Sequence, residues 1–278
     1  MDRNVKRSNN PPNNTAGRKK RRRGTGKKTL HIFLLSVFFL GAGFVLSLTV
    51  LFRIEAVLVL GSDKYAAEDL ALDSGVSAGD NLLRVSSGRV RSALMDKYPY
   101  IESVELRRKV PSTIEIHITQ CSPGGALKQG DDYILITKDG KALERGMILI
   151  PENIPLVIGM DAGDILPGEY LQNSRDNLDE QETARAQKAQ EALLTLRYLF
   201  DAMDESGFTD ITNLDITDPL NIKIMYENRL LIELGSEADL PYKLEFVGTI
   251  IRDNLEPDAR GIIHAGNARS RQVIVTPG

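Results

Sequence analysis

The segment IESVELRRKVPSTIEIHITQ, residues 101–120, has the pattern of two β-strands joined by a tight turn. Ile101–Val110 and Thr113–Gln120 are the two strands, and Pro111-Ser112 separates them. In the second strand apolar and polar side chains alternate, which places one face in a core and the other in solvent. The apolar positions are Ile114, Ile116 and Ile118, and the polar positions are Glu115, His117 and Thr119. The segment therefore predicts a β-hairpin with one buried face.

Upstream of the hairpin, the sequence predicts one strand and two helices. Ile54–Leu60 is β-rich and is closed by Gly-Ser-Asp, a turn sequence. Tyr65–Ser74 is rich in helix formers, with Leu70 and Leu72 expected to face inward, and it stops at a glycine. Ser86–Tyr98 repeats apolar residues every four positions, at Val90, Leu94 and Tyr98, before Pro99 ends it. The expected element order is β-α-α-β-β.

Thr29–Phe52, immediately before this region, contains no charged side chain. As a helix, these residues would extend about 36 Å at 1.5 Å per residue, enough to cross a hydrocarbon core of about 30 Å. The run follows the basic stretch Arg18–Arg23. Because positive charge beside a span stays on the cytoplasmic side, the sequence predicts one transmembrane helix over residues 29–52 with a cytoplasmic N-terminus.

Charge is divided unevenly between the two sides of this predicted span. Residues 1–28 hold eleven Lys/Arg and one acid, which leaves 24 Lys/Arg and 37 acids for the rest of the chain. The tail, residues 1–28, has almost no apolar residues, so we expect it to be disordered. A cleaved signal peptide is the main alternative, but its apolar region would be shorter and end at small residues. The basic stretch could also suggest a nucleic-acid patch; membrane topology explains it more simply, and no nucleic acid is expected as a partner.

Residues 123–278 predict a second domain of mixed α+β class with a mainly antiparallel, meandering sheet. Lys138-Asp139-Gly140 joins two short strands, because Asp-Gly favours a tight hairpin. A long helix, Glu182–Glu205, carries an apolar stripe. The remaining expected elements are the strands Tyr133–Thr137, Lys141–Leu143, Ile211–Ile216, Asn221–Tyr226, Arg229–Leu234, Ile262–His264 and Gln272–Thr276, and the helix Pro241–Leu255.

The sequence gives little reason to expect catalysis, a metal or a cofactor. Cys121 is the single cysteine, and His31, His117 and His264 are the only histidines, so a structural zinc site is not expected. Adjacent acids such as Asp131-Asp132 and Asp204-Glu205 are typical of solvated faces rather than of acid/base pairs. No G-x-S-x-G elbow or G-K-[ST] phosphate loop occurs. We therefore interpret the chain as a binding protein rather than an enzyme.

Two surfaces are candidates for binding a partner. The C-terminal strand, Gln272, Val273, Ile274, Val275 and Thr276, is short and uncharged, and an exposed edge strand lets another chain extend the sheet. An ordinary closing strand with a covered edge is an equally good interpretation of these residues alone. The second candidate is the polar hairpin connection with Arg107, Arg108 and Lys109, for which plain solvation is the simpler alternative.

A set of short motifs resembles the FtsQ/DivIB proteins of bacterial cell division. They are Val59-x-Gly61, Tyr65-x-x-Glu68-Asp69-Leu70, Gly79-x-Asn81-Leu82, Tyr98-Pro99-Tyr100-Ile101, Leu106-Arg107-Arg108-Lys109-Val110-Pro111 and Thr113-Ile114-x-Ile116. The layout of basic tail, one span, compact β-α-α-β-β domain and second β-rich domain is similar as well. The chain departs from the family pattern at Gln120-Cys121, where Glu-Arg is usual, and at Ile263-His264, where Ile-Asp is usual.

The resemblance implies a POTRA domain over residues 53–122 and a β domain over residues 123–278. It implies a non-enzymatic divisome scaffold, in the cell membrane at the division septum, with its C-terminal body outside the cytoplasm. The implied partners are FtsL, FtsB/DivIC and the septal transglycosylase/transpeptidase pair. It also favours the C-terminal strand as a binding surface, because the distal part of the β domain holds the single-span partners in that family.

Other functions remain open and make different structural predictions. An exported cell-wall enzyme would need a cleft in which titratable groups converge. A POTRA protein of outer-membrane secretion would need repeated amphipathic membrane strands with aromatic girdles, which we do not expect in a chain with 6% aromatic residues. A sensory receptor would have an apolar ligand pocket in the second domain.

Overall fold

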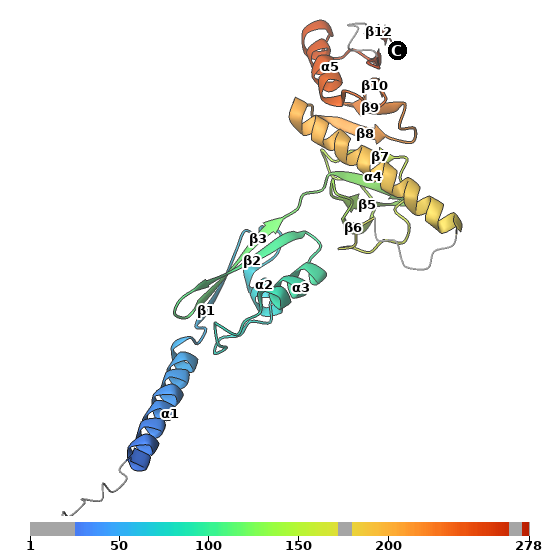
Figure 1. Cartoon of the computed structure of the whole chain (residues 1–278). Helices are drawn as coiled ribbons and strands as arrows, with labels where there is room; N and C mark the ends of the chain where they lie inside the picture. The colour runs from blue at the N-terminus through green and yellow to red at the C-terminus, as the bar shows by residue number, and fades with distance from the viewer. Residues whose placement is uncertain (1–25, 172–179, 267–273, 278) are drawn as a thin grey trace, which may run out of the picture. The chain divides into compact units, whose positions relative to one another are not determined.

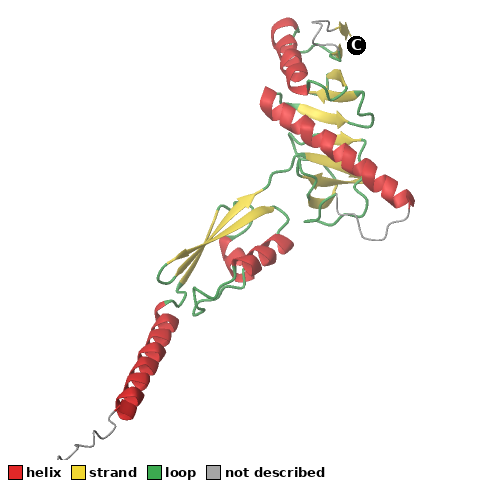
Figure 2. Ribbon diagram, viewed as in Figure 1, coloured by secondary structure: helices red, strands yellow, loops and turns green. Residues whose placement is uncertain are grey.

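The computed structural model describes residues 26–171, 180–266 and 274–277 (Figure 1). Contacts between residues divide the chain into two compact units, Met1–Leu51 and Phe52–Gly278. The second unit contains two β-sheets, one of three strands and one of nine (Figure 2). The predicted α+β class is thus confirmed for the second unit, with the two sheets in the order in which the sequence predicts them.

The first unit contains helix α1, Gly26–Leu51. It begins at Gly26 rather than at Thr29, the first residue of the uncharged run. In the part of the chain that the structure describes, no helix is long and apolar enough to cross a membrane. Most of the predicted disordered tail, residues 1–25, lies outside the described residues.

The three-stranded sheet confirms the β-α-α-β-β order. Its elements are β1 Ala56–Leu60, α2 Ala67–Asp73, α3 Ser87–Lys97, β2 Ile101–Lys109 and β3 Thr113–Gln120. Strand β3 lies in the centre, parallel to β1 and antiparallel to β2. Helices α2 and α3 pack on one face of the sheet (Figure 1), over the buried Ile114 and Ile116 predicted from the alternation.

The expectation that Leu72 faces inward is wrong. Leu70 is fully buried, whereas Leu72 is 80% exposed. Residues two positions apart on an α-helix point in nearly opposite directions, so Leu70 and Leu72 could share a face only in a strand. A stretch of seven helical residues shows too little periodicity to make this clear from the sequence.

The nine-stranded sheet has the order β12-β11-β10-β9-β8-β7-β4-β5-β6. Five of its eight pairings are antiparallel, as expected, but β4–β7, β7–β8 and β10–β11 are parallel, so it is not a simple meander. Its strands are β4 Gly125–Gln129, β5 Asp132–Ile136, β6 Ala142–Met147, β7 Leu156–Ile158, β8 Ile211–Asp215, β9 Ile222–Tyr226, β10 Leu230–Gly235, β11 Gly261–His264 and β12 Ile274–Pro277. The sequence did not predict β4 and β7.

Two helices cover the nine-stranded sheet: α4, Glu180–Ser206, and α5, Leu240–Asn254. Figure 1 shows α4 running across one face of the sheet. Its predicted apolar stripe is confirmed, because its residues belong to the main hydrophobic core. The residues are Ala192, Leu193, Leu196, Leu199 and Phe200, all buried, with Met203 packed against them.

Candidate partner-binding surfaces

Strand β12 forms one end of the nine-stranded sheet. It pairs antiparallel with β11, with Ile263 opposite Val275 and His264 opposite Ile274. Of the predicted binding strand, Ile274, Val275 and Thr276 lie in β12, whereas Gln272 and Val273 lie outside the described residues. Among the described strands only β11 neighbours β12, so the topology leaves the other side of β12 open.

Next to β12, a row of titratable side chains crosses strands β9, β10 and β11. Glu233 on β10 lies 2.7 Å from His264 Nδ1 and 3.3 Å from Lys223 Nζ. These two contacts lower the pKa of Glu233, the hydrogen bond with His264 contributing most. His264, where the family pattern has Asp, is therefore paired with a carboxylate on the neighbouring strand. In the strand register His264 stands opposite Ile274, so the row ends next to the predicted binding strand.

Arg107, Arg108 and Lys109 lie at the end of β2, in the three-stranded sheet. Arg107 pairs with Glu105 at 2.9 Å and Lys109 pairs with Glu115 at 3.1 Å. Arg108 points the other way, as alternation requires, and donates hydrogen bonds to the backbone. Its acceptors are the carbonyls of Leu82, at 3.1 Å, and Val85, at 2.7 Å.

The three cations thus have contacts inside their own domain, and Arg108 holds the loop between α2 and α3 onto the sheet. The structure does not bring them together with β12, which belongs to the other sheet. Sequence reasoning missed the role of Arg108, since its partners are backbone carbonyls more than twenty residues away. No side-chain pattern signals such a contact.

A polar bridge that the sequence did not predict joins the two sheets. Tyr100, just before β2, donates its hydroxyl to Glu144 on β6 at 2.7 Å, and Lys64 Nζ lies 2.5 Å from the same carboxylate oxygen. The Lys64 ammonium also sits 3.6 Å from the centre of the Tyr100 ring, a cation–π contact. Close by, the buried Lys141 donates to the carbonyl of Ile101 at 2.8 Å. These contacts hold the two sheets in one compact unit.

We expect Tyr100→Phe to lower the free energy of unfolding by about 1–2 kcal/mol at neutral pH, because it removes a buried hydrogen bond to a carboxylate. Burial, and then the bond to Glu144, raises the pKa of Tyr100 to about 12. In the unfolded chain a tyrosine titrates near 10. The stability that Tyr100 contributes is therefore present below pH 10 and is lost as the pH rises from about 10 to 12.

Urea unfolding of the full chain at several pH values, followed by circular dichroism, measures this effect. The difference in stability between the unmodified protein and Tyr100→Phe should shrink between pH 10 and 12. Tyr198→Phe, on an exposed part of α4, is the matched control and should have no effect at neutral pH. A constant difference across the whole pH range would contradict the prediction.

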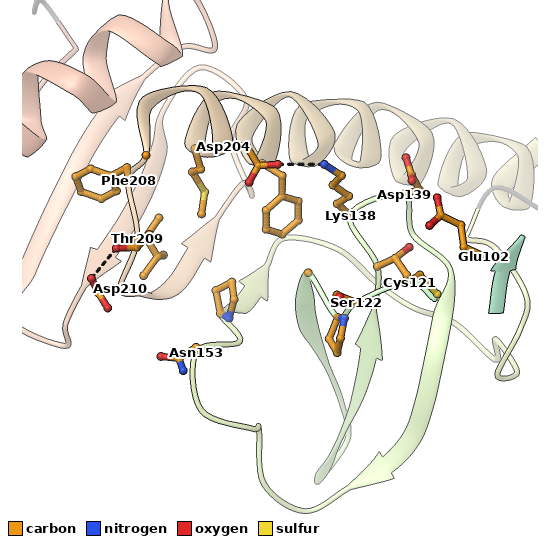
Figure 3. A pocket seen from close by; sticks show the side chains of 18 of the residues that line it. Glu102, Cys121, Ser122, Lys138, Asp139, Asn153, Asp204, Phe208, Thr209 and Asp210 are labelled. Carbon is orange, nitrogen blue, oxygen red and sulfur yellow. Dashed lines mark hydrogen bonds and ion pairs between the residues drawn. The ribbon is translucent and has the colours of Figure 1, made fainter. Parts of the chain in front are cut away.

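A groove of about 870 Å³ lies beside Cys121–Gly124, the linker between the three-stranded and the nine-stranded sheet (Figure 3). An exported enzyme would need titratable groups in such a groove, and four of the residues that line it have them: Cys121, Lys138, Asp204 and Asp210. Lys138 pairs with Asp204 at 3.1 Å, and this hydrogen bond raises the pKa of Lys138, which keeps it protonated. Burial raises the pKa of the Cys121 thiol, so it is a poor nucleophile at neutral pH. The groove thus offers neither a base nor an activated nucleophile at these two residues, and it does not support the enzyme alternative.

The lining of the groove is also mixed rather than apolar, which argues against the ligand pocket expected of a sensory receptor. Among the residues that the structure describes, no cluster of three or more His, Cys, Asp or Glu side chains could hold a metal ion.

Comparison with known proteins gives the three-stranded sheet a family. Residues 52–120 match the family described as "POTRA domain, FtsQ-type". The chain is also 25% identical to a cell division protein DivIB of Clostridium botulinum over 252 residues, which cover 88% of this chain and 89% of that protein. The chain is a homologue of the FtsQ and DivIB cell division proteins.

Two further relatives show how the similarity is distributed. The FtsQ/DivIB homologue is 26% identical to DivIB of Clostridium acetobutylicum over 205 residues, covering 73% of this chain and 76% of the relative. It is 33% identical to FtsQ of a Geobacter species over 92 residues, one third of each chain. The similarity to DivIB proteins thus covers most of the chain, and it supports a role in cell division.

Proposed function

We propose that this FtsQ/DivIB homologue is a non-enzymatic scaffold of the divisome. It binds the single-span partners FtsL and FtsB/DivIC and links them to the septal transglycosylase/transpeptidase pair. The observation that carries the proposal is an open edge strand, β12, in a chain similar over 88% of its length to a DivIB cell division protein. The described side chains of the groove, with a protonated Lys138 and a poorly nucleophilic Cys121, fit a protein without chemistry of its own.

The proposed placement is in the cell membrane at the division septum. Residues 29–52 form the single span, with the basic tail in the cytoplasm and residues 53–278 outside it. The support is the uncharged run and the eleven Lys/Arg that precede it. Only three residues separate residue 52 from β1 at Ala56, and a body tethered to the membrane meets membrane-anchored partners at high local concentration.

A partner would bind at β12 by adding one of its own strands to this end of the nine-stranded sheet. In an antiparallel pair, successive residues direct their N–H and C=O groups alternately toward the neighbouring strand and away from it. On β12 the groups that point away from β11 are free to pair with a strand of the partner. The backbone would provide affinity, and side chains beside the edge, such as His264, would provide selectivity.

The test is co-purification of the full chain with FtsL and FtsB/DivIC-like proteins. We compare the intact chain, a truncation before Gln272, and the single variants Ile274→Pro and Val275→Pro. Because these two neighbouring residues direct their N–H groups to opposite sides, one proline removes a bond to β11 and the other removes an outward N–H. The variant that loses only the outward N–H should keep its melting temperature and lose at least ten-fold in partner affinity.

Binding of the folded truncation or of both proline variants at full strength would show that β12 is not the contact. Absence of septal localisation of the intact chain in dividing cells would count against the divisome role itself.

A further inference from the structure

The groove beside the linker is built from parts of the second unit that are far apart in the sequence. One side is the linker Cys121–Gly124, and the other is the end of α4 with the start of β8 (Figure 3). Its apolar lining comes from Phe200, Phe208 and Ile211, which are 5–7% exposed, together with Met203 and Pro155. At about 870 Å³ it has room for several amino-acid residues.

The end of α4 that borders the groove has charges of the unfavourable sign. The last two turns contain Asp201, Asp204 and Glu205, and no basic residue stands in the last turn. A helix C-terminus carries a partial negative charge, so carboxylates there are destabilising relative to neutral residues. Lys138, from the hairpin between β5 and β6, contacts two of them, at 3.1 Å from Asp204 and 3.7 Å from Asp201.

Further carboxylates lie along the rim of the groove. Asp210, at the start of β8, accepts a hydrogen bond from Thr209 at 2.7 Å, and Glu102 and Asp139 lie at the other end (Figure 3). The lining thus carries four carboxylates, at Glu102, Asp139, Asp204 and Asp210, against the ammonium of Lys138, and Asp139 also pairs with Arg197 at 3.1 Å. A negative rim around an apolar floor complements a ligand with positive charge beside an apolar group.

We propose that this groove binds an extended segment of a partner protein in which a large apolar side chain is flanked by Lys or Arg. The apolar side chain packs against Phe200, Met203 and Phe208. The flanking cations pair with Asp204 and Asp210, where they also offset the negative end of α4. This surface is separate from β12 and goes beyond the proposed function, since it would take a second partner, or a second segment of the same partner.

The test uses the full chain in detergent and a labelled pentapeptide with phenylalanine flanked by two lysines and capped by serines. Fluorescence anisotropy measures its binding at low ionic strength. The double variant Asp204→Lys with Asp210→Lys should weaken binding at least ten-fold, because the charges at the rim are reversed. Both residues are exposed, but Asp210 has a φ of +63°, which aspartate adopts more readily than lysine, so the variant should stay folded with a melting temperature a few degrees lower than that of the intact protein.

Three controls make the result specific. Asp258→Lys changes the charge at an exposed position that does not line the groove and should leave binding unchanged. A peptide with glutamates in place of the lysines should not bind, and one with alanine in place of phenylalanine should bind at least five-fold more weakly. Equal binding of the lysine peptide by the intact chain and the double variant would overturn the proposal. The Ile274→Pro and Val275→Pro variants should bind the peptide normally, so failure here leaves the β12 contact intact.

Discussion

Gly61→Ala should lower the free energy of unfolding by about 3 kcal/mol, because an alanine at this position is strained and collides with the neighbouring strand. Gly61 follows β1 directly and has a φ of +86°. A Cβ there would lie 2.2 Å from the carbonyl oxygen of Ile118 on β3, and a backbone atom cannot move aside as a flexible side chain can. The backbone of β1 or β3 would have to shift, which disturbs their parallel pairing.

Gly75→Ala is the matched control for this prediction. Gly75 also has a positive φ, +69°, but an added Cβ would have no heavy atom within 4 Å. It should therefore cost only the conformational penalty, about 1 kcal/mol. Urea unfolding of the full chain, followed by circular dichroism, gives both values, and hydrogen exchange of peptides from β1 and β3 locates the effect. Equal destabilisation by the two variants would show that the close approach to Ile118 is not the cause.

Local patterns predicted those parts of the fold in which one face is buried over a long run. The alternation in β3 and the four-residue spacing in α4 both reflect a single covered face, and the side chains they place inward are buried. Gly61 belongs to this group as well, since a strand followed by glycine predicted a turn. The sequence could not tell that the reason for glycine is contact with Ile118, which is 57 positions away.

The elements that the sequence missed depend on distant partners. Strand β4, GALKQ, contains Lys and Gln and has no strong strand pattern of its own, yet β5 and β7 enclose it on both sides. Strand β7 has three residues. The parallel pair β10–β11 requires a crossover, and α5 provides it, although each of these three elements was predicted separately.

The candidate site also has a part that local sequence patterns predicted and a part that depends on distant residues. That residues 274–276 form a strand was predictable, whereas the position of β12 at the end of the sheet depends on the order of all nine strands. The bridge of Tyr100, Lys64 and Glu144 joins residues 44 and 80 positions apart, so no local motif could indicate it. The groove likewise combines the end of α4 with the linker, and only the acidic end of α4 was visible in the sequence.

Lys243→Ala should be about as destabilising as the glycine substitution, at about 3 kcal/mol. Lys243 lies on α5, is 5% exposed, and donates hydrogen bonds of 2.8 Å to the carbonyls of Leu234 and Ser236 at the end of β10. Its removal leaves two carbonyls without this donor and opens space where the aliphatic stem packed. Because β10 supports β11 and through it β12, the loss should loosen the part of the sheet that carries the proposed contact.

Lys243→Met separates the two contributions, since methionine keeps most of the stem and removes only the donor; we expect it to cost about 1–2 kcal/mol. Burial lowers the pKa of Lys243 below its usual 10.5, so the folded protein binds fewer protons than the unfolded chain in the interval below pH 10.5. Stability of the intact protein should therefore rise with pH in that interval relative to Lys243→Met, which lacks the group.

Lys188→Ala, at an exposed position of α4, is the control and should change stability by less than about 0.5 kcal/mol. If the difference between the intact protein and Lys243→Met does not grow as the pH rises toward 10.5, the buried ammonium is not the group responsible. If Lys243→Ala and Lys243→Met are equally destabilising, the two carbonyl contacts rather than the stem hold α5 to the sheet.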